Sequence, residues 1–299
     1  MMHQFLPVTA TAANQRCLPG GLRYSICTLV SDTQKYAQML QSFEAGGFTT
    51  ADCEFLYLDN TETNLFDAYI GINIFLRTSQ GAYAIICHQD VELIEDGMHK
   101  LDKVIRELDA IDPAWGMFGN AGALEGGGRA LRISDPHGEN QNVGGIFPIR
   151  VATLDENFIV VRQEANLAVS RDLTGFHLYG TELALVANRL GCNVYVVDFH
   201  LRHRGRGIID DSFYTSRQAL IDKCKTACRW RWLTTPCTEI PVMSSTVLHC
   251  LAASKPGAKT VKFLMKMHRW LVVSLGLESR TNLTRPGGSS SSDPKVTLR

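Results

Sequence analysis

The sequence predicts an α/β fold: a mainly parallel sheet flanked by helices. Segments typical of strands and of helices alternate along the first half of the 299 residues. Residues 82–87 form an unbroken apolar run, as in a strand buried on both faces. Repeated strand–helix–strand order implies parallel strands joined by right-handed crossovers. With 45% apolar residues, the chain can build one main domain with tails.

Three strand–helix pairs are expected before residue 113. They are strand 24–30 with helix 33–45, strand 53–58 with helix 64–79, and strand 82–87 with helix 95–111. Gly46 and Gly47 end the first helix. The third helix presents an apolar stripe with helical spacing and is followed by Pro113.

The second half is less regular. Residues 116–145 are rich in Gly, Asn and Asp, which predicts loops and short hairpins. A strand at 158–162, a helix at 181–190 and a strand at 193–199 are expected after them. Gly191 follows the helix in the position typical of a C-cap.

The expected domain organisation has four parts: a flexible leader at 1–22, the α/β domain at 23–240, a helical extension at 241–278 and a disordered tail at 279–299. The tail is rich in Ser, Gly and Pro. Residues 259–277 predict a helix with apolar and basic residues. Two interpretations stay open: a helix docked on the core, or a basic helix lying on a membrane surface or a partner.

Composition excludes some classes of protein. The 30 Lys and Arg balance the 30 Asp and Glu, so bulk binding of nucleic acid is not expected. The nine cysteines are scattered, odd in number and without zinc-finger spacing, which indicates free thiols in a reducing cytoplasm. No signal peptide or transmembrane run is recognised. We therefore expect a cytoplasmic protein, with peripheral membrane contact through 259–277 left open.

Polar residues directly follow the first three predicted strands. These residues are Ser31 and Asp32, Asp59 and Asn60, and His88, Gln89 and Asp90. In an open parallel sheet, ligands bind beyond the carboxyl ends of the strands. Carboxylates gathered there repel each other unless a cation or ligand hydroxyls lie between them. The alternatives are that Asp32 caps a helix and that Asp59 and Asn60 form a simple turn.

A divalent cation that bridges two phosphates needs one or two carboxylates and open coordination positions. Asp90 suits that role, and His203, just past the strand at 193–199, is the best second ligand. Imidazole with carboxylate favours Mn²⁺ somewhat over Mg²⁺. His200 and His203 can instead form a surface pair without metal. Nearby Arg202, Arg204 and Arg206 can balance diphosphate charge or simply be solvated.

Residues 175–183 lead into a helix and bring several functional groups together. Transfer of a group to a hydroxyl acceptor needs a base that takes the proton of that hydroxyl. Glu182 and His177 are the candidate catalytic residues. Alternatively, Glu182 only stabilises the helix N-terminus through its dipole.

Three blocks of sequence, at 83–91, 176–183 and 194–203, resemble the family 2-like glycosyltransferases of the GT-A superfamily. The resemblance extends over about residues 23–236. It implies a GT-A-type single domain that moves a sugar from a nucleotide-sugar donor to a glycan, lipid-linked or protein acceptor, assisted by Mn²⁺ or Mg²⁺ and with inversion.

The resemblance also implies residue roles. His88-Gln89-Asp90 stands at the metal-binding Asp-x-Asp motif, with His in place of the first Asp. Asp32 and Asp59 match positions that hold the nucleoside, and His203 matches a downstream metal ligand.

On the acceptor side, Gly180 stands at the base position and Glu182 matches the second acidic residue of the motif. The pair Asp155 and Glu156 is a further acidic candidate that can face the acceptor or form a turn.

Two other functions remain open. A nucleotidyltransferase normally has a Gly-rich, cationic phosphate loop after the first strand, and residues 31–35 contain no glycine. A non-catalytic domain that binds a nucleotide-sugar would account for His88 and Gly180.

Overall fold

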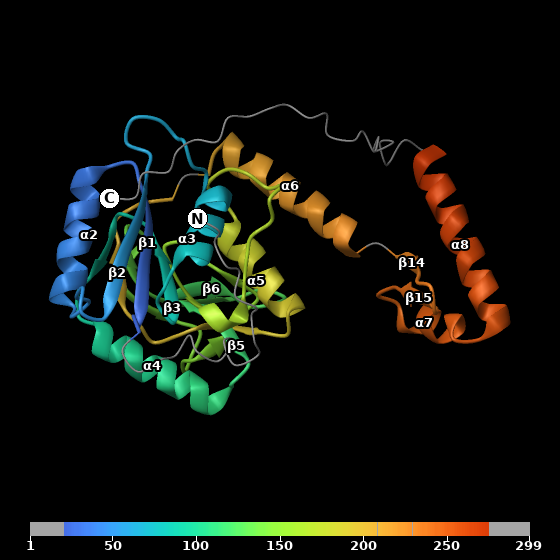
Figure 1. Ribbon diagram of the computed structural model, residues 1–299, viewed down its shortest axis with the longest axis horizontal. Coiled ribbons are helices and arrows are strands. Elements are labelled where there is room, and N and C mark those ends of the chain that lie inside the picture. Colours follow the sequence, from blue (N-terminus) through green and yellow to red (C-terminus); the bar gives the residue numbers. More distant parts are fainter. Residues whose placement is uncertain (1–20, 208, 229, 275–299) are drawn as a thin grey trace, which may run out of the picture. The chain divides into compact units, whose positions relative to one another are not determined.

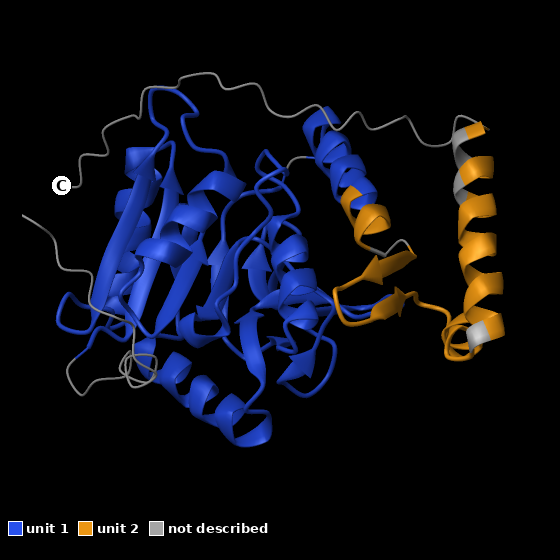
Figure 2. Cartoon of the chain, turned by 45° about the vertical axis from the view of Figure 1, so that its right-hand side comes forward, with its two compact units in different colours: residues 1–222 blue, residues 223–299 orange. Residues whose placement is uncertain are grey.

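The computed structural model describes residues 21–207, 209–228 and 230–274. It divides the chain into two compact units, residues 1–222 and 223–299 (Figure 2). Nearly all of the expected leader and all of the expected tail lie outside the described residues. The sequence-based domain boundary at 240 stays a prediction, since the units divide after Asp222.

A seven-stranded sheet forms the centre of the first unit (Figure 1). Its strands, in spatial order, are β2 (Cys53–Asp59), β1 (Tyr24–Val30), β3 (Tyr83–Cys87), β11 (Phe158–Arg162), β5 (Trp115–Gly119), β12 (Asn193–Val196) and β9 (Ile149–Arg150). The pairs β1–β2, β1–β3 and β5–β12 are parallel, whereas β11 and β9 run antiparallel to their neighbours. The predicted α/β class with a mainly parallel sheet is therefore confirmed.

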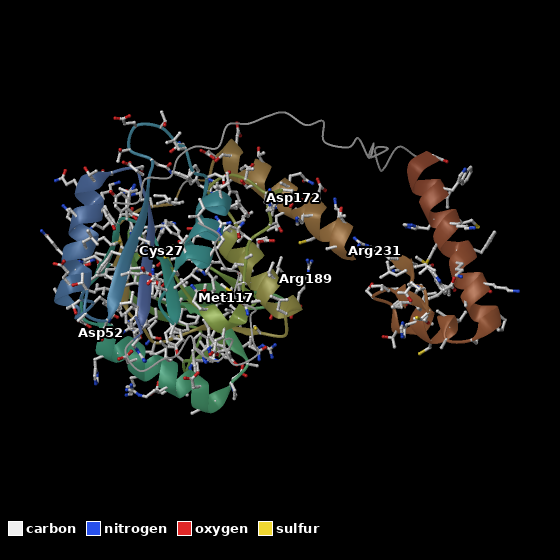
Figure 3. The ribbon with its side chains drawn as sticks, in the orientation of Figure 1. Cys27, Asp52, Met117, Asp172, Arg189 and Arg231 are labelled. Carbon is white, nitrogen blue, oxygen red and sulfur yellow. The ribbon has the colours of Figure 1, made fainter. Side chains whose placement is uncertain are left out.

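Helices cover both faces of this sheet. They are α2 (Thr33–Ala45), α3 (Ala68–Thr78), α4 (Met98–Ile111) and α5 (Tyr179–Arg189). Buried side chains of α2 and α4, such as Phe43 and Leu101, share one core with Tyr24 and Ile26 of β1. A short 3₁₀ helix, Gln163–Ala165, follows β11. Figure 3 shows Cys27 and Met117 within the sheet, where both are fully buried.

A second, smaller sheet lies in the same unit. Its spatial order is β10 (Thr153–Leu154), β6 (Ala121–Ala123), β7 (Arg129–Asp135), β13 (Leu201–His203) and β4 (Val91–Leu93), and β8 (Gly138–Val143) pairs with β7. Strand β13 runs antiparallel to β4, with His203 opposite Val91. This register brings the chain near residue 203 beside the end of β3.

The bounds of some elements match the prediction, and others differ from it. Strands at 24–30 and 158–162 and the helix at 33–45 have the predicted bounds. The second helix begins at Ala68, later than predicted, because the Asp67 side chain caps it by accepting from the N–H of Ile70. Strand β5 was missed within the stretch interpreted as loops, and helix α6 (Asp211–Cys228) was also missed.

The second unit, described by itself, contains a hairpin and two helices. These elements are β14 (Arg231–Thr234), β15 (Glu239–Val242), α7 (Thr246–Ala252) and α8 (Lys255–Ser274). Helix α6 runs across the division between the units. Among the described helices, none combines the length and apolarity needed to cross a membrane.

Candidate metal and nucleotide site

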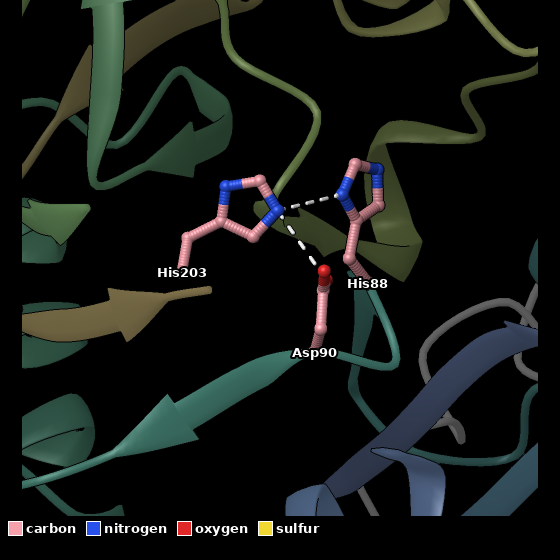
Figure 4. A group of neighbouring side chains, drawn as sticks. All are labelled: His88, Asp90 and His203. Atoms are coloured by element: carbon pink, nitrogen blue, oxygen red, sulfur yellow. Dashed lines mark hydrogen bonds and ion pairs between the residues drawn. The ribbon is translucent and has the colours of Figure 1, made fainter. Parts of the chain in front are cut away.

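Three side chains converge where β3 ends. His88 and Asp90 lie in the short turn between β3 and β4, and His203 ends β13 (Figure 4). His203 Nε2 lies 3.3 Å from His88 Nδ1 and 3.3 Å from Asp90 Oδ1. One ligand atom from each residue lies within 4.8 Å of the other two. Two imidazole nitrogens and one carboxylate oxygen thus face a common point.

The space around this point suits a cation. The side chains of His203 and Asp90 are 14% and 16% exposed, so the point is partly shielded yet reachable. A Cβ atom on Gly205 would lie 2.8 Å from Asp90 Oδ2 and 3.1 Å from His203 Nε2. Glycine at this position therefore leaves open a space that any side chain would fill. Two imidazoles and one carboxylate can hold a divalent cation.

The protonation states favour ligand binding. Burial lowers the pKa of His88, and the neighbouring His203 lowers it further, against the opposing charges of Asp90 and Asp155. Burial disfavours ionised Asp90, yet its hydrogen bond to His203 and the charges of both histidines hold its pKa below the usual value. At neutral pH the site offers a neutral imidazole and a carboxylate, the forms that metals bind.

Tyr179 orients the His88 ring. The Tyr179 hydroxyl donates its proton to the backbone carbonyl of Glu156, 3.1 Å away, and lies 3.0 Å from His88 Nε2. A hydroxyl has one proton, so its lone pair must accept from an N–H at His88 Nε2. The lone pair of His88 is then on Nδ1, the atom that faces His203. Outer partners of this kind commonly fix the tautomer of metal-binding histidines.

Gln89 lies between the two ligand positions and makes different contacts. Its Oε1 accepts from the backbone N–H groups of Ser31 and Asp32 at 2.9 and 2.8 Å, and its Nε2 donates to Ser31 Oγ at 2.8 Å. These bonds join the β1–α2 loop to the turn that carries His88 and Asp90.

The other predicted donor-binding residues hold local structure. Asp32 is the N-cap of α2 and accepts from the N–H groups of Gln34 and Lys35. Asp59 accepts from the backbone and hydroxyl of Thr61, which lowers its pKa. The predicted nucleoside contacts of these two carboxylates stay predictions.

Asn60 is buried and closes the loop that follows β2. Its side chain donates to the carbonyl of Phe66 at 2.7 Å and accepts from the N–H of Phe66 at 3.0 Å. Topology nevertheless brings the carboxyl ends of β2, β1 and β3 side by side, with Val30 opposite Asp59. The role of Asn60 in donor binding stays a prediction.

An open pocket of ≈ 190 Å³ adjoins the metal-binding cluster. Its lining residues are Lys35, Gln38, Met39, Asp90, Val91, Glu92, Arg204 and Gly205. Lys35 and Arg204 supply positive charge beside Asp90, and Arg204 also pairs with Glu92 at 2.7 Å. Arg202 pairs with Glu139 and Glu92. The pocket can therefore accept an anionic group next to a cation held by Asp90.

The two predicted catalytic residues contact other segments. Glu182 is 4% exposed, and its carboxylate accepts from the N–H and hydroxyl of Ser170 at 3.2 and 2.6 Å. His177 Nε2 lies 3.1 Å from Ser212 Oγ, and its ring packs edge-on against Phe213.

The alternative interpretation of His200 and His203 as a surface pair is wrong. His200 is 4% exposed, and its Nε2 lies 2.9 Å from the hydroxyl of Ser134. His203 instead contacts His88 and Asp90. His200 precedes β13 and is buried beside Ser134 of β7, so the two histidines make separate contacts.

The acidic pair before β11 lies beside Tyr179. Asp155 accepts from the N–H of Asn157 at 3.0 Å and so forms the predicted turn. Burial raises the pKa of Glu156 to about 8, with a further contribution from Asp155, against the opposing N–H groups of Gly180 and Leu178. Leu178 has a φ of +64° at the start of α5, a costly conformation for a residue with a Cβ.

Gly180 is constrained by the same acidic loop. A Cβ atom on Gly180 would lie 2.7 Å from the carbonyl oxygen of Leu154 and 3.4 Å from Glu156 Cγ. A larger residue at position 180 would therefore clash with the backbone. The Glu156 side chain lies beside the place where the side chain of residue 180 would begin.

Three features of the site were not predicted from the sequence. They are the contact of Tyr179 with His88, the open space at Gly205 and the bridging contacts of Gln89. Tyr179 lies in the segment singled out before α5, but its spacing from His88 gives no signal of contact. The pairing of β11 with β3, which places Phe158 opposite Cys87, and the packing of α5 against the loop before β11 bring these segments together.

No protein-family model matches the chain. The protein "ATP synthase subunits region ORF 6" of Fuscovulum blasticum is 40% identical over 215 residues, which cover 70% of this chain and 85% of that protein.

Several solved structures are also similar. S. aureus TarS 1-349 in complex with UDP-GlcNAc has a TM-score of 0.48 and 11% identity, over 68% of this chain and 67% of that one. Mannosyltransferase PcManGT of Pyrobaculum calidifontis, in complex with GDP-Man and Mn²⁺, has a TM-score of 0.44 and 11% identity, over 72% and 69%. With TM-scores this low, these similarities carry no argument about the reaction.

Proposed function

Since this chain belongs to the family of the ORF 6 protein of the Fuscovulum blasticum ATP synthase region, a name that states no reaction, we propose a function from its site. The protein is a metal-dependent glycosyltransferase that moves a sugar from a nucleotide-sugar donor to a hydroxyl acceptor. The observation that carries this proposal is the cluster of His88, Asp90 and His203 beside a pocket lined by Lys35 and Arg204 at the carboxyl end of β3.

The donor diphosphate binds at this cluster. Asp90, His203 and His88 would hold Mn²⁺ or Mg²⁺, while Lys35 and Arg204 line the adjoining pocket. A cation held there would neutralise charge that develops on the departing nucleoside diphosphate. Tyr179 keeps the lone pair of His88 directed at the cluster, and Gly205 keeps the adjacent space open.

Glu156 is the base that the geometry favours. The sequence resemblance assigns the base position to Gly180, which cannot carry a side chain because the carbonyl of Leu154 is too close. Glu156 approaches the same place from the preceding loop, and burial raises its pKa to about 8. A base with a pKa near the working pH accepts a hydroxyl proton efficiently. Glu182, the sequence-based choice, holds Ser170 instead.

Transfer by a single displacement, with one base for the acceptor, inverts the configuration of the anomeric carbon. Glu156 takes the proton of the acceptor hydroxyl, the acceptor oxygen forms the new glycosidic bond, and the bond between the sugar and the diphosphate breaks. The nucleoside diphosphate leaves with the electron pair of that bond. The acceptor is a glycan, a lipid-linked sugar or a protein hydroxyl.

Calorimetric titration with UDP and GDP, with and without Mn²⁺, tests the proposal. We expect binding that requires Mn²⁺ and that the Asp90→Asn variant loses. Glu125→Gln, an exposed carboxylate in the turn between β6 and β7, is the matched control and should bind as wild type. Equal affinity of the wild type and Asp90→Asn in Mn²⁺ would refute the proposal.

A further inference from the structure

Exposed apolar side chains are concentrated near the end of the described chain. Of the 21 large apolar side chains that are exposed among the described residues, 11 lie within residues 230–274. Among the residues of that segment whose burial the structure describes, which leave out 255, 269, 272 and 273, the buried apolar ones are Ala252 and Val261. Exposed apolar patches of this kind mark surfaces that bind a protein or a membrane.

Helix α8 carries the densest part of this surface. Its exposed residues are Phe263, Leu264, Met267, Trp270 and Leu271, and Trp270 is 67% exposed. Their spacing of three, four and seven residues places them on one side of the helix. Val261, which is 1% exposed, lies beyond the Leu264 edge of this face, about 120° from its centre in the helical projection, and packs within the unit. One flank of α8 thus anchors the helix, and the exposed face presents two aromatic rings to its surroundings.

The charges along α8 have one sign. The helix contains Lys255, Lys259, Lys262, Lys266 and Arg269, and the sequence has no Asp or Glu between Glu239 and Glu278. Lys259 and Lys266 lie along one border of the apolar face in the helical projection, and His268 lies near the other. Residues 223–299 together contain 13 Lys and Arg but only three Asp and Glu.

We propose that the apolar face of α8 inserts into the surface of a membrane that contains anionic lipid. An apolar face with aromatic residues and a border of lysines is the pattern of helices that lie in the headgroup region. The lysines pair with lipid phosphates while Phe263 and Trp270 enter the acyl boundary. A second copy of this chain is the less favourable occupant, because two such faces would bring like charges together.

Vesicle flotation of the full chain tests this surface. We expect binding to phosphatidylcholine vesicles that contain phosphatidylglycerol, at least tenfold weaker binding to pure phosphatidylcholine, and a loss of binding as salt rises. The double variant Phe263→Ser/Trp270→Ser should bind the anionic vesicles at least tenfold less. Leu65→Ser/Ile111→Ser, which alters two exposed apolar residues of the other unit, is the matched control and should bind as wild type.

A second variant separates charge from apolar insertion. Lys259→Glu/Lys266→Glu keeps both aromatic residues and should also lose binding to anionic vesicles. All four altered residues of α8 are exposed, so circular dichroism should show unchanged helix content. Absence of vesicle binding, or equal binding by wild type and both α8 variants, overturns the proposal. A dimer in lipid-free buffer that the Phe263→Ser/Trp270→Ser variant dissociates overturns it as well, in favour of a second copy.

Discussion

The two compact units differ in where they place their apolar residues and in the sign of their charge. Residues 1–222 hold the whole extended core and carry 17 Lys and Arg against 27 Asp and Glu. Residues 223–299 carry 13 against 3 and expose most of their large apolar side chains in the described part. The zero net charge of the chain hides this asymmetry. The proposed sugar transfer belongs to the first unit, and the proposed membrane contact belongs to the second.

The largest expected effect tests whether the acidic unit supplies the base. Glu156→Gln should lower turnover by about 10²-fold or more, the usual effect of losing a general base, while donor affinity stays near the wild-type value. Glu182→Gln should mainly lower stability, because its carboxylate holds Ser170. Turnover with a nucleotide-sugar and donor binding measure the two effects. The reverse pattern would return the base to Glu182.

The dependence of stability on pH tests the raised pKa of Glu156. The pKa of Glu156 is raised from 4.5 to about 8, so folding takes up a proton between these values. Its stabilising contribution is complete below the unfolded pKa and is lost as pH rises through the folded pKa. The stability of Glu156→Gln relative to wild type should therefore increase between pH 5 and 9, by roughly 4 kcal/mol. Urea denaturation at each pH measures this difference, and parallel curves for the two proteins would contradict it.

The cation site offers a smaller effect. Gly205→Ala places a methyl group 2.8 Å from Asp90 Oδ2 and should weaken Mn²⁺ binding by about tenfold, as changes around metal ligands often do. Gly207→Ala is the control for disturbance of the same loop, because its Cβ atom meets no neighbour within 4 Å while the φ of +66° strains the backbone there. Titration calorimetry with Mn²⁺ compares them. Equal weakening in both variants would indicate a disturbance of the loop rather than of the cation site.

The smallest expected effect concerns the independence of the two units. A chain that ends at residue 229 keeps His88, Asp90 and His203 with all their contacts, so its Mn²⁺ affinity should match that of the full chain. The same truncation should abolish binding to anionic vesicles. A large loss of Mn²⁺ affinity would break the assignment of chemistry to the first unit alone.

Local sequence patterns predicted most of the central sheet, but β5 shows where they fail. Trp115–Gly119 is a fully buried strand, yet two of its five residues are glycine, a residue typical of loops. A Cβ atom on Gly116 would lie 2.6 Å from Cys192 Cβ, and one on Gly119 would lie 2.9 Å from the carbonyl oxygen of Phe158. These glycines are required by contacts with distant segments, which local composition cannot reveal.

The candidate site divides in the same way. The cluster of Asp90 and His203 was predicted because each residue follows a predicted strand. The carboxyl ends of parallel strands meet at one edge of the sheet, where ligands bind. The contact of Tyr179 with His88 spans 91 positions of sequence and depends on how α5 packs. The position of Glu156 beside Gly180 depends on the same packing. Motifs that follow strands could be recognised, whereas partners brought in by packing could not.

Gln89 has a consequence for the history of the family. Its amide bonds both backbone N–H groups after β1 and the hydroxyl of Ser31, so the residue between the two cation ligands also sets the spacing of two neighbouring loops. A substitution at position 89 leaves both backbone N–H groups without this acceptor, whatever side chain stands at position 31, so the β1–α2 loop depends on Gln89 itself. Natural variants of this protein should therefore keep a side-chain acceptor at position 89 more strictly than the hydroxyl at position 31.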